Sequence, residues 1–447
     1  SRSNRRPLGP ARSPMMDRPT GVRHVMVGVT TLVAVMLYLD RVCLSIVGEA
    51  IKKDQGITPE QYAMLLSAFF WAYALFQIPA GWLGDRFGAR VVLSAYLFWW
   101  SACTGLMGMA SGFAALLALR LGCGIFEAGA YPLASGVIKA WVPSRERGLA
   151  SGIVAVGGRL GGAIAPVLTA SIASATADGW RLPFIVYGAV GMAGAAVFYW
   201  WFRNDPATHP AVNPSELAII GRHADSATPH PGTGLPPLEV FAFNFPLWMC
   251  SLVQFLSNFS WVFIITLFPT YLEKVHQTPL GTRAWYQAIP LYFGILGMLA
   301  GGKLSDVAMR RFGPRWGRAL PMAASRVLVG FAYLGCLASP DAFSIMLLMC
   351  LVAWAGDFGT APVWAWSQDV GGRHVGALLG WANMWGNLGA AVAPIVIQKI
   401  QSQYQTPENP AAGWAVVFAV CASTQVIGAI AAMFVSSSQP IGRPAAA

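Results

Sequence analysis

Twelve predominantly apolar runs follow one another along the chain, separated by polar segments. An α-helix needs about 20 such residues to cross the hydrocarbon core of a bilayer, so each run predicts one transmembrane helix. The first six runs cover residues 22–47, 61–83, 89–110, 113–138, 148–174 and 181–202, and the second six cover residues 241–270, 286–308, 318–338, 342–367, 373–400 and 413–435. The sequence therefore predicts an all-α polytopic membrane protein.

The composition excludes the other broad classes of protein. Hydrophobic residues make up 55% of the chain and charged residues 11%, whereas soluble domains carry about 25% charged residues. The same hydrophobic content excludes a disordered chain. The seven cysteines lie within apolar runs and show neither C-x-x-C spacing nor a disulfide framework. Because the sequence has no cluster of metal ligands and no nucleophile triad, we expect no metal, no cofactor and no enzymatic activity.

The charge distribution predicts the orientation of the helices. The net charge is +11, but the basic residues gather in alternate loops instead of on one soluble face, so nucleic acid is not an expected partner. Of the 30 Lys and Arg residues, 20 lie on one side of the predicted membrane when those at helix ends are included. Cytoplasmic loops carry such an excess, so both termini are predicted to be cytoplasmic.

An internal repeat divides the chain into two halves. The segment after the second run reads GWLGDRFGAR and the one after the eighth reads GGKLSDVAMRRFG, which places Asp85 and Asp306 at equivalent positions. Paired halves with a binding site between them are a plan of secondary transporters. The predicted organisation is a basic tail that is disordered or an added extension (1–20), a six-helix half (21–202), a cytoplasmic linker (203–240), a second six-helix half (241–436) and a cytoplasmic tail (437–447).

Motifs in the first half resemble one family of transporters. The loop GWLGDRFGAR resembles the signature of the major facilitator superfamily, and the segments YLDR, SAFFWAYALFQIPAGWLGDRFG, LRLGCGIFEAGAYP and WVPSRERG are similar to its anion:cation symporter family. That family includes bacterial galactonate, glucarate and hexuronate transporters and animal sialic-acid and vesicular glutamate carriers. The resemblance implies the major facilitator fold with twelve helices and ion-coupled movement of organic anions. We accordingly expect a monomer in the cell membrane that binds a small organic anion and protons.

Ionisable residues within the runs are candidates for function, because a charge in the membrane interior is unfavourable unless it faces a cavity or a partner. Asp40 and Arg41 are adjacent in the first run, about 100° apart on a helix, so one arrangement directs Arg41 to a central cavity and Asp40 to a neighbouring helix. By resemblance Arg41 binds the substrate, and its planar fork of donors suits a carboxylate. Asp40 and Glu127 match positions that carry coupling protons, and Arg120 lies two turns before Glu127. A structural ion pair is the alternative for each.

Neutral side chains complete the predicted substrate site. The amides and hydroxyls among them can bind the hydroxyl groups of a sugar acid. Gln77 and Asn387 are expected to form hydrogen bonds between helices instead. The residues that match cavity positions of the family are Tyr38, Tyr73, Gln254, Trp364 and Asn383.

The tenth run departs from the family pattern. Ala361 and Val363 stand where the sugar-acid transporters have hydroxyl residues, and Asp357 adds a carboxylate one turn earlier. This difference argues against galactonate itself and makes Asp357 and Arg159 candidate selectivity residues. Arg159 or Arg326 can pair with Asp357 or contact the far end of the substrate, and a purely structural role is the alternative for both.

The repeated loops after the second and eighth runs predict a gate. Charge pairs from these loops to neighbouring helices can latch the outward-facing state, as such loops do in the superfamily. The alternative is a role in topology alone, because the arginines also add to the positive charge of the cytoplasmic side. The candidate gating residues are Asp85, Arg86, Arg90 and Asp306.

The function predicted from the sequence is proton-coupled symport of an organic anion, a carboxylate such as a sugar acid, by alternating access. An exchanger or uniporter of organic anions or phosphate esters is the alternative, although the seventh run lacks the arginine that would complete a two-arginine phosphate clamp. A membrane-embedded enzyme has no catalytic motif to support it, and a channel would not need the duplicated loops.

Overall fold

The computed structural model of the chain describes residues 18–175, 179–221, 241–339, 341–372, 374–404 and 411–438, and over these residues it contains helices and no strands. The first half contains α1 (Val22–Ile46), α2 (Gly48–Gln55), α3 (Pro59–Phe87), α4 (Ala89–Met107), α5 (Phe113–Glu127), α6 (Ala130–Trp141), the 3-10 turn η1 (Ser144–Glu146), α7 (Arg147–Ala173) and α8 (Arg181–Trp201). The linker contains η2 (Pro206–Thr208) and α9 (Pro214–Ile220). The second half contains α11 (Phe245–Val262), the π-helical turn η4 (Phe263–Leu267), α12 (Phe268–Lys274), α13 (Leu280–Trp316), α14 (Ala319–Ala338), α15 (Ala342–Phe358), α16 (Thr360–Val370), α17 (Val375–Tyr404) and α18 (Ala412–Ala432).

Every predicted transmembrane run is helical in the structure, which confirms the all-α fold. Ten helical segments of the described chain are long and apolar enough to cross a membrane by themselves. The third and eleventh runs, α4 and α17, fall outside that set and complete the bundle. The ends of the chain, most of the linker after residue 221 and the loop at 405–410 lie outside the described residues.

Two equivalent spans, the fourth of each half, are broken near their middle. The fourth span consists of α5 and α6, with a break after Glu127, and the tenth consists of α15 and α16, with a break at Gly359. Gly359 allows close packing there, because a Cβ at this position would lie 2.4 Å from Nη2 of Arg326. Each break places ionisable side chains at the centre of the bundle.

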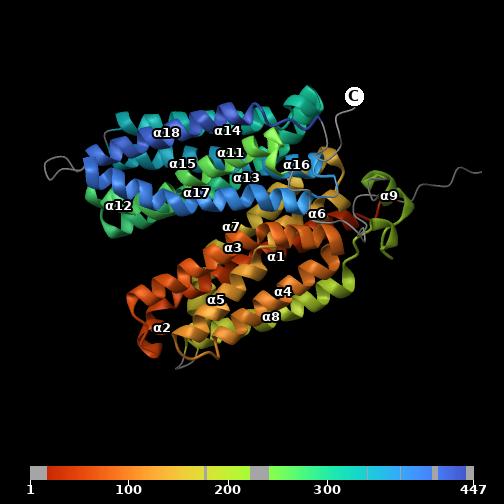
Figure 1. Cartoon of the computed structure of the whole chain (residues 1–447), viewed down its shortest axis with the longest axis horizontal. Coiled ribbons are helices and arrows are strands. Elements are labelled where there is room, and N and C mark those ends of the chain that lie inside the picture. Colours follow the sequence, from red (N-terminus) through yellow and green to blue (C-terminus); the bar gives the residue numbers. More distant parts are fainter. Residues whose placement is uncertain are drawn as a thin grey trace, which may run out of the picture.

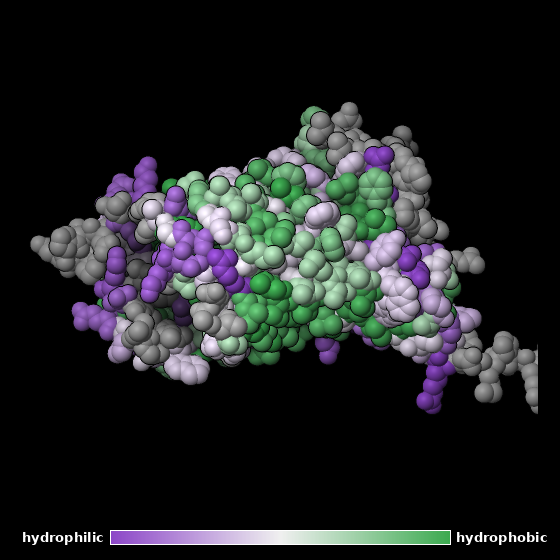
Figure 2. Space-filling model, turned by 90° about the horizontal axis from the view of Figure 1, so that it is seen from below, coloured by the Kyte–Doolittle hydropathy of each residue, from purple (hydrophilic) through white to green (hydrophobic). Residues whose placement is uncertain are grey.

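The outer surface of the bundle is apolar where lipid would contact it. Figure 2 shows one face on which hydrophobic residues cover the middle of the molecule and hydrophilic residues gather toward its ends. Large apolar side chains such as Leu32, Phe331 and Trp200 are 62–74% exposed. Water would disfavour so many exposed apolar groups, whereas the hydrocarbon core of a bilayer accommodates them.

The two halves approach each other closely at the end of the bundle where α6, α16 and α9 lie, which we term the linker end, and they diverge toward α2 and α12 (Figure 1). Glycines allow this approach. A Cβ on Gly81 of α3 would lie 2.2 Å from the carbonyl oxygen of Gly376 on α17, and a Cβ on Gly302 of α13 would lie 2.6 Å from the carbonyl oxygen of Gly148 on α7. Small residues at helix interfaces let backbones pack directly, so the linker end is closed.

The linker helix α9 is attached to the start of α1. Glu216 is fully buried and accepts hydrogen bonds from the backbone N–H groups of Gly21 and Arg23 at 3.0 and 3.2 Å. It also pairs with the Arg23 side chain at 2.9 Å. A carboxylate at a helix N-terminus satisfies free N–H groups and the helix dipole, so α9 caps α1 from a distant part of the chain.

Candidate functional site

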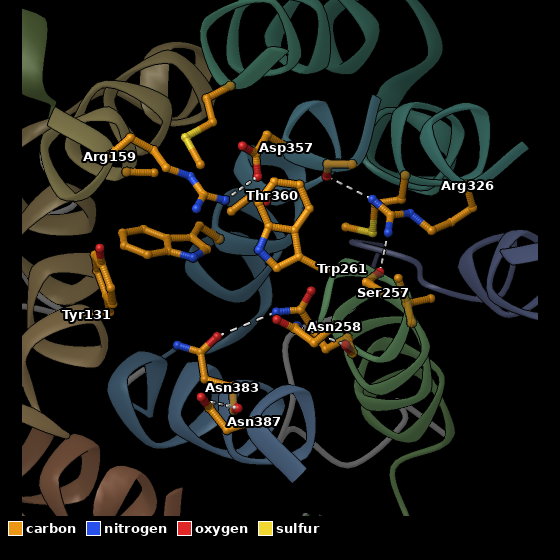
Figure 3. Close-up of a pocket in the computed structure, with 18 of the residues that line it drawn as sticks. Tyr131, Arg159, Ser257, Asn258, Trp261, Arg326, Asp357, Thr360, Asn383 and Asn387 are labelled. Atoms are coloured by element: carbon orange, nitrogen blue, oxygen red, sulfur yellow. Dashed lines mark hydrogen bonds and ion pairs between the residues drawn. The ribbon is translucent and has the colours of Figure 1, made fainter. Parts of the chain in front are cut away.

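A cavity of about 200 Å³ lies between the two halves near the centre of the bundle. Its wall alternates charged, aromatic and amide side chains, and both halves contribute to it (Figure 3). All six residues predicted to bind substrate line it, together with both candidate selectivity residues. These eight are Tyr38, Arg41, Tyr73, Gln254, Trp364, Asn383, Arg159 and Asp357.

Arg41 lies at the cavity wall on α1 and is held in place by three aromatic rings and a carboxylate. Its Nη2 donates to Oε2 of Glu127 at 3.2 Å. Its guanidinium lies 4.6–5.2 Å from the ring centroids of Tyr38, Phe69 and Tyr73. Such contacts orient a guanidinium without consuming its hydrogen-bond donors. The Arg41 side chain is 16% exposed, so it can donate to an anion in the cavity.

The three residues predicted for proton coupling lie behind Arg41 and are not part of the cavity wall. Glu127 is fully buried, and its Oε1 has no hydrogen-bond partner among the described residues. Asp40 points toward α4 and accepts a hydrogen bond from Nε1 of Trp100 at 3.0 Å. Arg120 is buried with its guanidinium 4.6 Å from the Phe69 ring centroid, so Arg120 and Arg41 contact the same ring. Two guanidiniums therefore share one aromatic side chain, and Glu127 pairs with one of them.

An ion pair joins the two halves at the far side of the cavity. Nη2 of Arg159 on α7 donates to Oδ1 of Asp357 on α15 at 2.9 Å. The Arg159 guanidinium also lies 4.6 Å from the ring centroid of Trp261 on α11. Arg326 of α14 lines the same region and donates to the carbonyl oxygen of Gly356 at 2.9 Å. Of the pairings that the sequence allows for Asp357, the structure contains the one with Arg159.

Glycines on α7 bring Arg159 to this position. A Cβ on Gly157 would lie 2.5 Å from the carbonyl oxygen of Thr31, and one on Gly161 would lie 2.4 Å from that of Val35. These contacts allow α7 to pack against α1 backbone to backbone. As a result Arg159 and Arg41, which belong to neighbouring helices, reach the same cavity.

Several cavity residues were not predicted from the sequence. Ser257, Asn258 and Trp261 line the cavity with Gln254. Their spacing of three, four and seven residues from Gln254 is that of one helix face, and this pattern was a signal that could have found them. Tyr131 and Thr360 also line it; Thr360 directly precedes Ala361, one of the positions where the sugar-acid transporters have a hydroxyl residue. Arg326, which the sequence offered as a partner of Asp357 or of the substrate, lines the cavity as well.

The amide groups in the cavity bind one another. Nε2 of Gln254 lies 3.5 Å from Oδ1 of Asn383, and Nδ2 of Asn258 donates to the Gln254 carbonyl oxygen at 3.0 Å. Asn387 also lines the cavity and donates to the Asn383 carbonyl oxygen at 2.8 Å. Gln77 is buried, and it is not among the lining residues. The amides thus form a neutral polar part of the cavity wall.

Aromatic and polar contacts close the cavity toward the linker end. The rings of Tyr131 on α6 and Trp364 on α16 meet edge to face, with centroids 5.0 Å apart. Below them Nε2 of Gln368 donates to the hydroxyls of Ser135 and Ser151 at 3.1 Å each. Gln368 is fully buried. These contacts pair α16 of the second half with α6 and α7 of the first.

The two repeated carboxylates each cap a helix of the opposite half. Asp85 accepts hydrogen bonds from the N–H groups of Gly376 and Ala377 at the start of α17, both at 3.0 Å. Asp306 accepts hydrogen bonds from the N–H groups of Gly148 and Leu149 at the start of α7, at 3.1 and 3.0 Å. A carboxylate is favoured at a helix N-terminus. Both contacts join the two halves at the linker end.

A second set of contacts at the linker end was not anticipated from the sequence. Arg318 is buried and pairs with Asp306 at 2.8 Å and with Asp369 at 2.9 Å. Asp369 also pairs across the halves with Arg147 at 3.4 Å. Lys139 donates to the carbonyl oxygen of Gly372 in the other half. These pairs cannot be read from the sequence, because the two residues of each pair lie in different helices or loops.

The two arginines predicted for the gate lie on the first half. Arg90 donates to the Tyr199 carbonyl oxygen at 2.8 Å and stacks on the Tyr199 ring. Arg86 lies over the rings of Trp82 and Phe87. None of the contacts that the structure describes for either arginine reaches the second half. A gating role for them stays a prediction.

We expect Asp85→Asn to open the linker end. Asparagine keeps one oxygen acceptor, now uncharged, and has an NH2 group in place of the other carboxylate oxygen. A hydrogen bond to a charged group is worth about 1.5–3 kcal/mol. A loss of about 1–2 kcal/mol shifts the population of states by about 5- to 30-fold. Labelling of single cysteines in the cavity from the two sides of the membrane measures this shift. The control is Asp54→Asn, because Asp54 contacts Trp180 and Arg181 of its own half. An unchanged labelling pattern in Asp85→Asn would exclude the gate.

Sequence comparisons agree with this architecture. The family model for the Major Facilitator Superfamily matches residues 30–394. The chain is 32% identical over 437 residues to the "Probable sulfoacetate transporter" of Cupriavidus necator, covering 96% of this chain and 97% of that protein. It is 28% identical over 397 residues to the "Probable galactarate/D-glucarate transporter" of Bacillus subtilis, covering 85% of this chain and 86% of that protein.

Solved structures share the fold. The fucose:proton symporter of E. coli matches with a TM-score of 0.70 at 15% identity, over 94% of this chain and all of that one. The human organic anion transporter MFSD10 matches with a TM-score of 0.68 at 17% identity, over 92% of this chain and 99% of that one. Fold, family profile and relatives agree: this chain is a membrane transporter and belongs to the major facilitator superfamily, in the anion:cation symporter family that its motifs resemble.

Proposed function

We propose that this transporter moves an organic anion with a carboxylate group, such as a sugar acid, together with protons. The observation that carries the proposal is the position of Arg41, which lines the cavity and pairs with the buried Glu127 behind it. The relatives are named for sulfoacetate, for galactarate and D-glucarate, and for D-galactonate, all of which are organic acids. These names support an organic anion as the substrate.

Competition for Arg41 couples the anion to the proton. While Glu127 is ionised, it holds Nη2 of Arg41. A proton bound at Oε1 of Glu127, which has no partner among the described residues, neutralises the carboxylate and weakens the ion pair. Arg41 can then donate both arms of its guanidinium to the substrate carboxylate. The other charged groups near Glu127 are Arg120 on α5 and Asp40 on α1, and the hydroxyl of Tyr73 on α3 faces Arg41.

The contacts at the linker end support a transport cycle by alternating access. With both termini in the cytoplasm, a closed linker end corresponds to an outward-facing state, in which the substrate enters from outside the cell. Breaking the caps at Asp85 and Asp306 lets the halves rock around the cavity and opens it to the cytoplasm. We further propose that the protein acts as a monomer in the cell membrane.

Transport by the purified protein in proteoliposomes tests the proposal. Labelled sulfoacetate, glucarate, galactarate and galactonate are each presented with and without an imposed pH gradient, inside alkaline. Symport predicts accumulation of at least one anion above its outside concentration only with the gradient. Exchange of labelled for unlabelled anion identifies a carrier. Counterflow that is insensitive to the gradient would favour the exchanger or uniporter, and no flux of any organic acid would exclude the proposed function.

A further inference from the structure

One of the three cations that line the cavity is buried and lacks a counter-charge. Arg326 is only 4% exposed. Its guanidinium donates to neutral acceptors, which are the hydroxyls of Ser257 and Ser325, the amide of Gln425 and the carbonyl oxygen of Gly356. Among the described residues no carboxylate lies within ion-pair distance of it, and its Nε has no hydrogen-bond partner. A buried charge without a partner is strongly unfavourable, so an anion at this position would be stabilised.

The carboxylate closest to Arg326 is already paired with another arginine. Asp357 bonds through Oδ1 to Arg159, while its Oδ2 has no partner among the described residues. In the view of Figure 3, Asp357 lies between Arg159 and Arg326. One carboxylate is therefore the nearest negative charge for two guanidiniums and pairs with only one of them. The three side chains carry a net charge of +1 at the side of the cavity formed by α7, α14 and α15.

The net charge of the whole cavity wall also indicates that an anion is needed in addition to the carboxylates of the protein. Three lining residues are cationic, Arg41, Arg159 and Arg326, and Asp357 is the one anionic side chain that lines the described cavity. Glu127 behind Arg41 supplies one further negative charge. Once Glu127 is protonated, as the proposed symport requires, two positive charges have no counter-charge. One acid group on the substrate would neutralise only Arg41.

We propose that Arg326 and Arg159 form a second anion subsite and that the transported substrate carries two acid groups. This inference rests on the proposed function, because Arg41 binds the first acid group. The second acid group lies against Arg326 and shares Arg159 with Asp357. The amides of Gln254 and Asn383, which also line the cavity, can form hydrogen bonds with the rest of the substrate. Because Arg41 and Arg159 belong to the first half and Arg326 to the second, such a substrate bridges both halves.

Matched pairs of acids test this subsite on the full-length protein in detergent. Each pair has the same carbon skeleton or nearly so and differs in one acid group: gluconate and glucarate, butyrate and succinate, acetate and sulfoacetate. Affinities are measured by calorimetry and checked by thermal stabilisation. We expect the diacid of at least one pair to bind at least tenfold more tightly than its monoacid. Equal affinities within all three pairs would overturn the proposal.

Two variants then locate the second acid group. Arg326→Gln and Arg159→Gln should bring the diacid-to-monoacid affinity ratio close to one, whereas Arg41→Lys should weaken both acids of a pair. Arg181→Gln, at the start of α8 and away from the cavity, is the control and should keep the wild-type ratio. A purely structural role for Arg326 and Arg159 predicts that both acids weaken together with an unchanged ratio, which would also overturn the proposal. Monoacids that bind through Arg41 without any preference for diacids would leave the proposed function intact.

Discussion

Arg41→Lys is expected to lower uptake of the organic anion by about 10- to 100-fold. Lysine keeps the positive charge but replaces a planar fork of donors by a single ammonium group. The loss of one charge-assisted hydrogen bond is worth about 1.5–3 kcal/mol, and each 1.4 kcal/mol is a factor of ten in affinity. Lysine also forgoes the stacking that holds the guanidinium on Tyr38 and Tyr73. Substrate affinity by calorimetry and uptake into proteoliposomes measure the effect.

A matched control separates binding from folding in this experiment. Arg181→Lys also removes a guanidinium from an aromatic ring, that of Trp180, but Arg181 does not line the cavity. It should retain wild-type affinity and uptake. Thermal unfolding of both variants in the absence of ligand shows whether either is destabilised. Near-wild-type affinity in Arg41→Lys would assign Arg41 a structural role.

Glu127→Gln should abolish accumulation driven by a pH gradient while retaining counterflow. Glutamine preserves the size of the side chain and an oxygen that accepts from Arg41, but it cannot take up a proton. One pH unit supplies about 1.4 kcal/mol per proton, so the wild-type protein can concentrate its substrate about tenfold for each coupled proton. In the variant this ratio should fall to one. Exchange of bound anion for bound anion needs no proton and continues.

Asp40, the other carboxylate proposed for proton coupling, allows a second version of this test. Asn at position 40 can still accept the hydrogen bond of Trp100, so Asp40→Asn should behave like Glu127→Gln if the two carboxyls act in one relay. The combined variant should then be little worse than either alone, because coupled residues are not additive. Glu146→Gln, on the exposed turn η1, is the control. Intact gradient-driven accumulation in both single variants would exclude these carboxylates and leave Asp357 as the next candidate.

The helices could be predicted from the sequence because their signal is local. Apolar runs mark each span, and the starts of several helices carry their own caps, such as Thr58 before α3 and Asp341 before α15. The resemblance pointed to Tyr38, Arg41 and Tyr73, which line the cavity, because each lies in a motif that is contiguous in the chain. In the first half, the resemblance to the family therefore predicts individual side chains of the site.

The contacts between the halves could not be predicted, because they depend on how distant helices pack. Gln368 and Ser135 are 233 residues apart, and Arg147 and Asp369 are 222 apart. The sequence offers Arg159 and Arg326 equally as partners for Asp357, and only the packing of α7 against α1 decides between them. The break in the tenth span could not be predicted either. It brings Thr360 to the cavity wall instead of the following alanine.

The two helix caps at the linker end have the pattern of a contact across a two-fold axis. The second span of each half reaches the fifth span of the other half, Asp85 of α3 to α17 and Asp306 of α13 to α7. In a symmetric dimer of identical subunits, one carboxylate would make both contacts, and one substitution would break both. In a single chain with two unlike halves each contact can change alone. The stability of the closed state can therefore be adjusted in separate steps, without changing either half of the cavity.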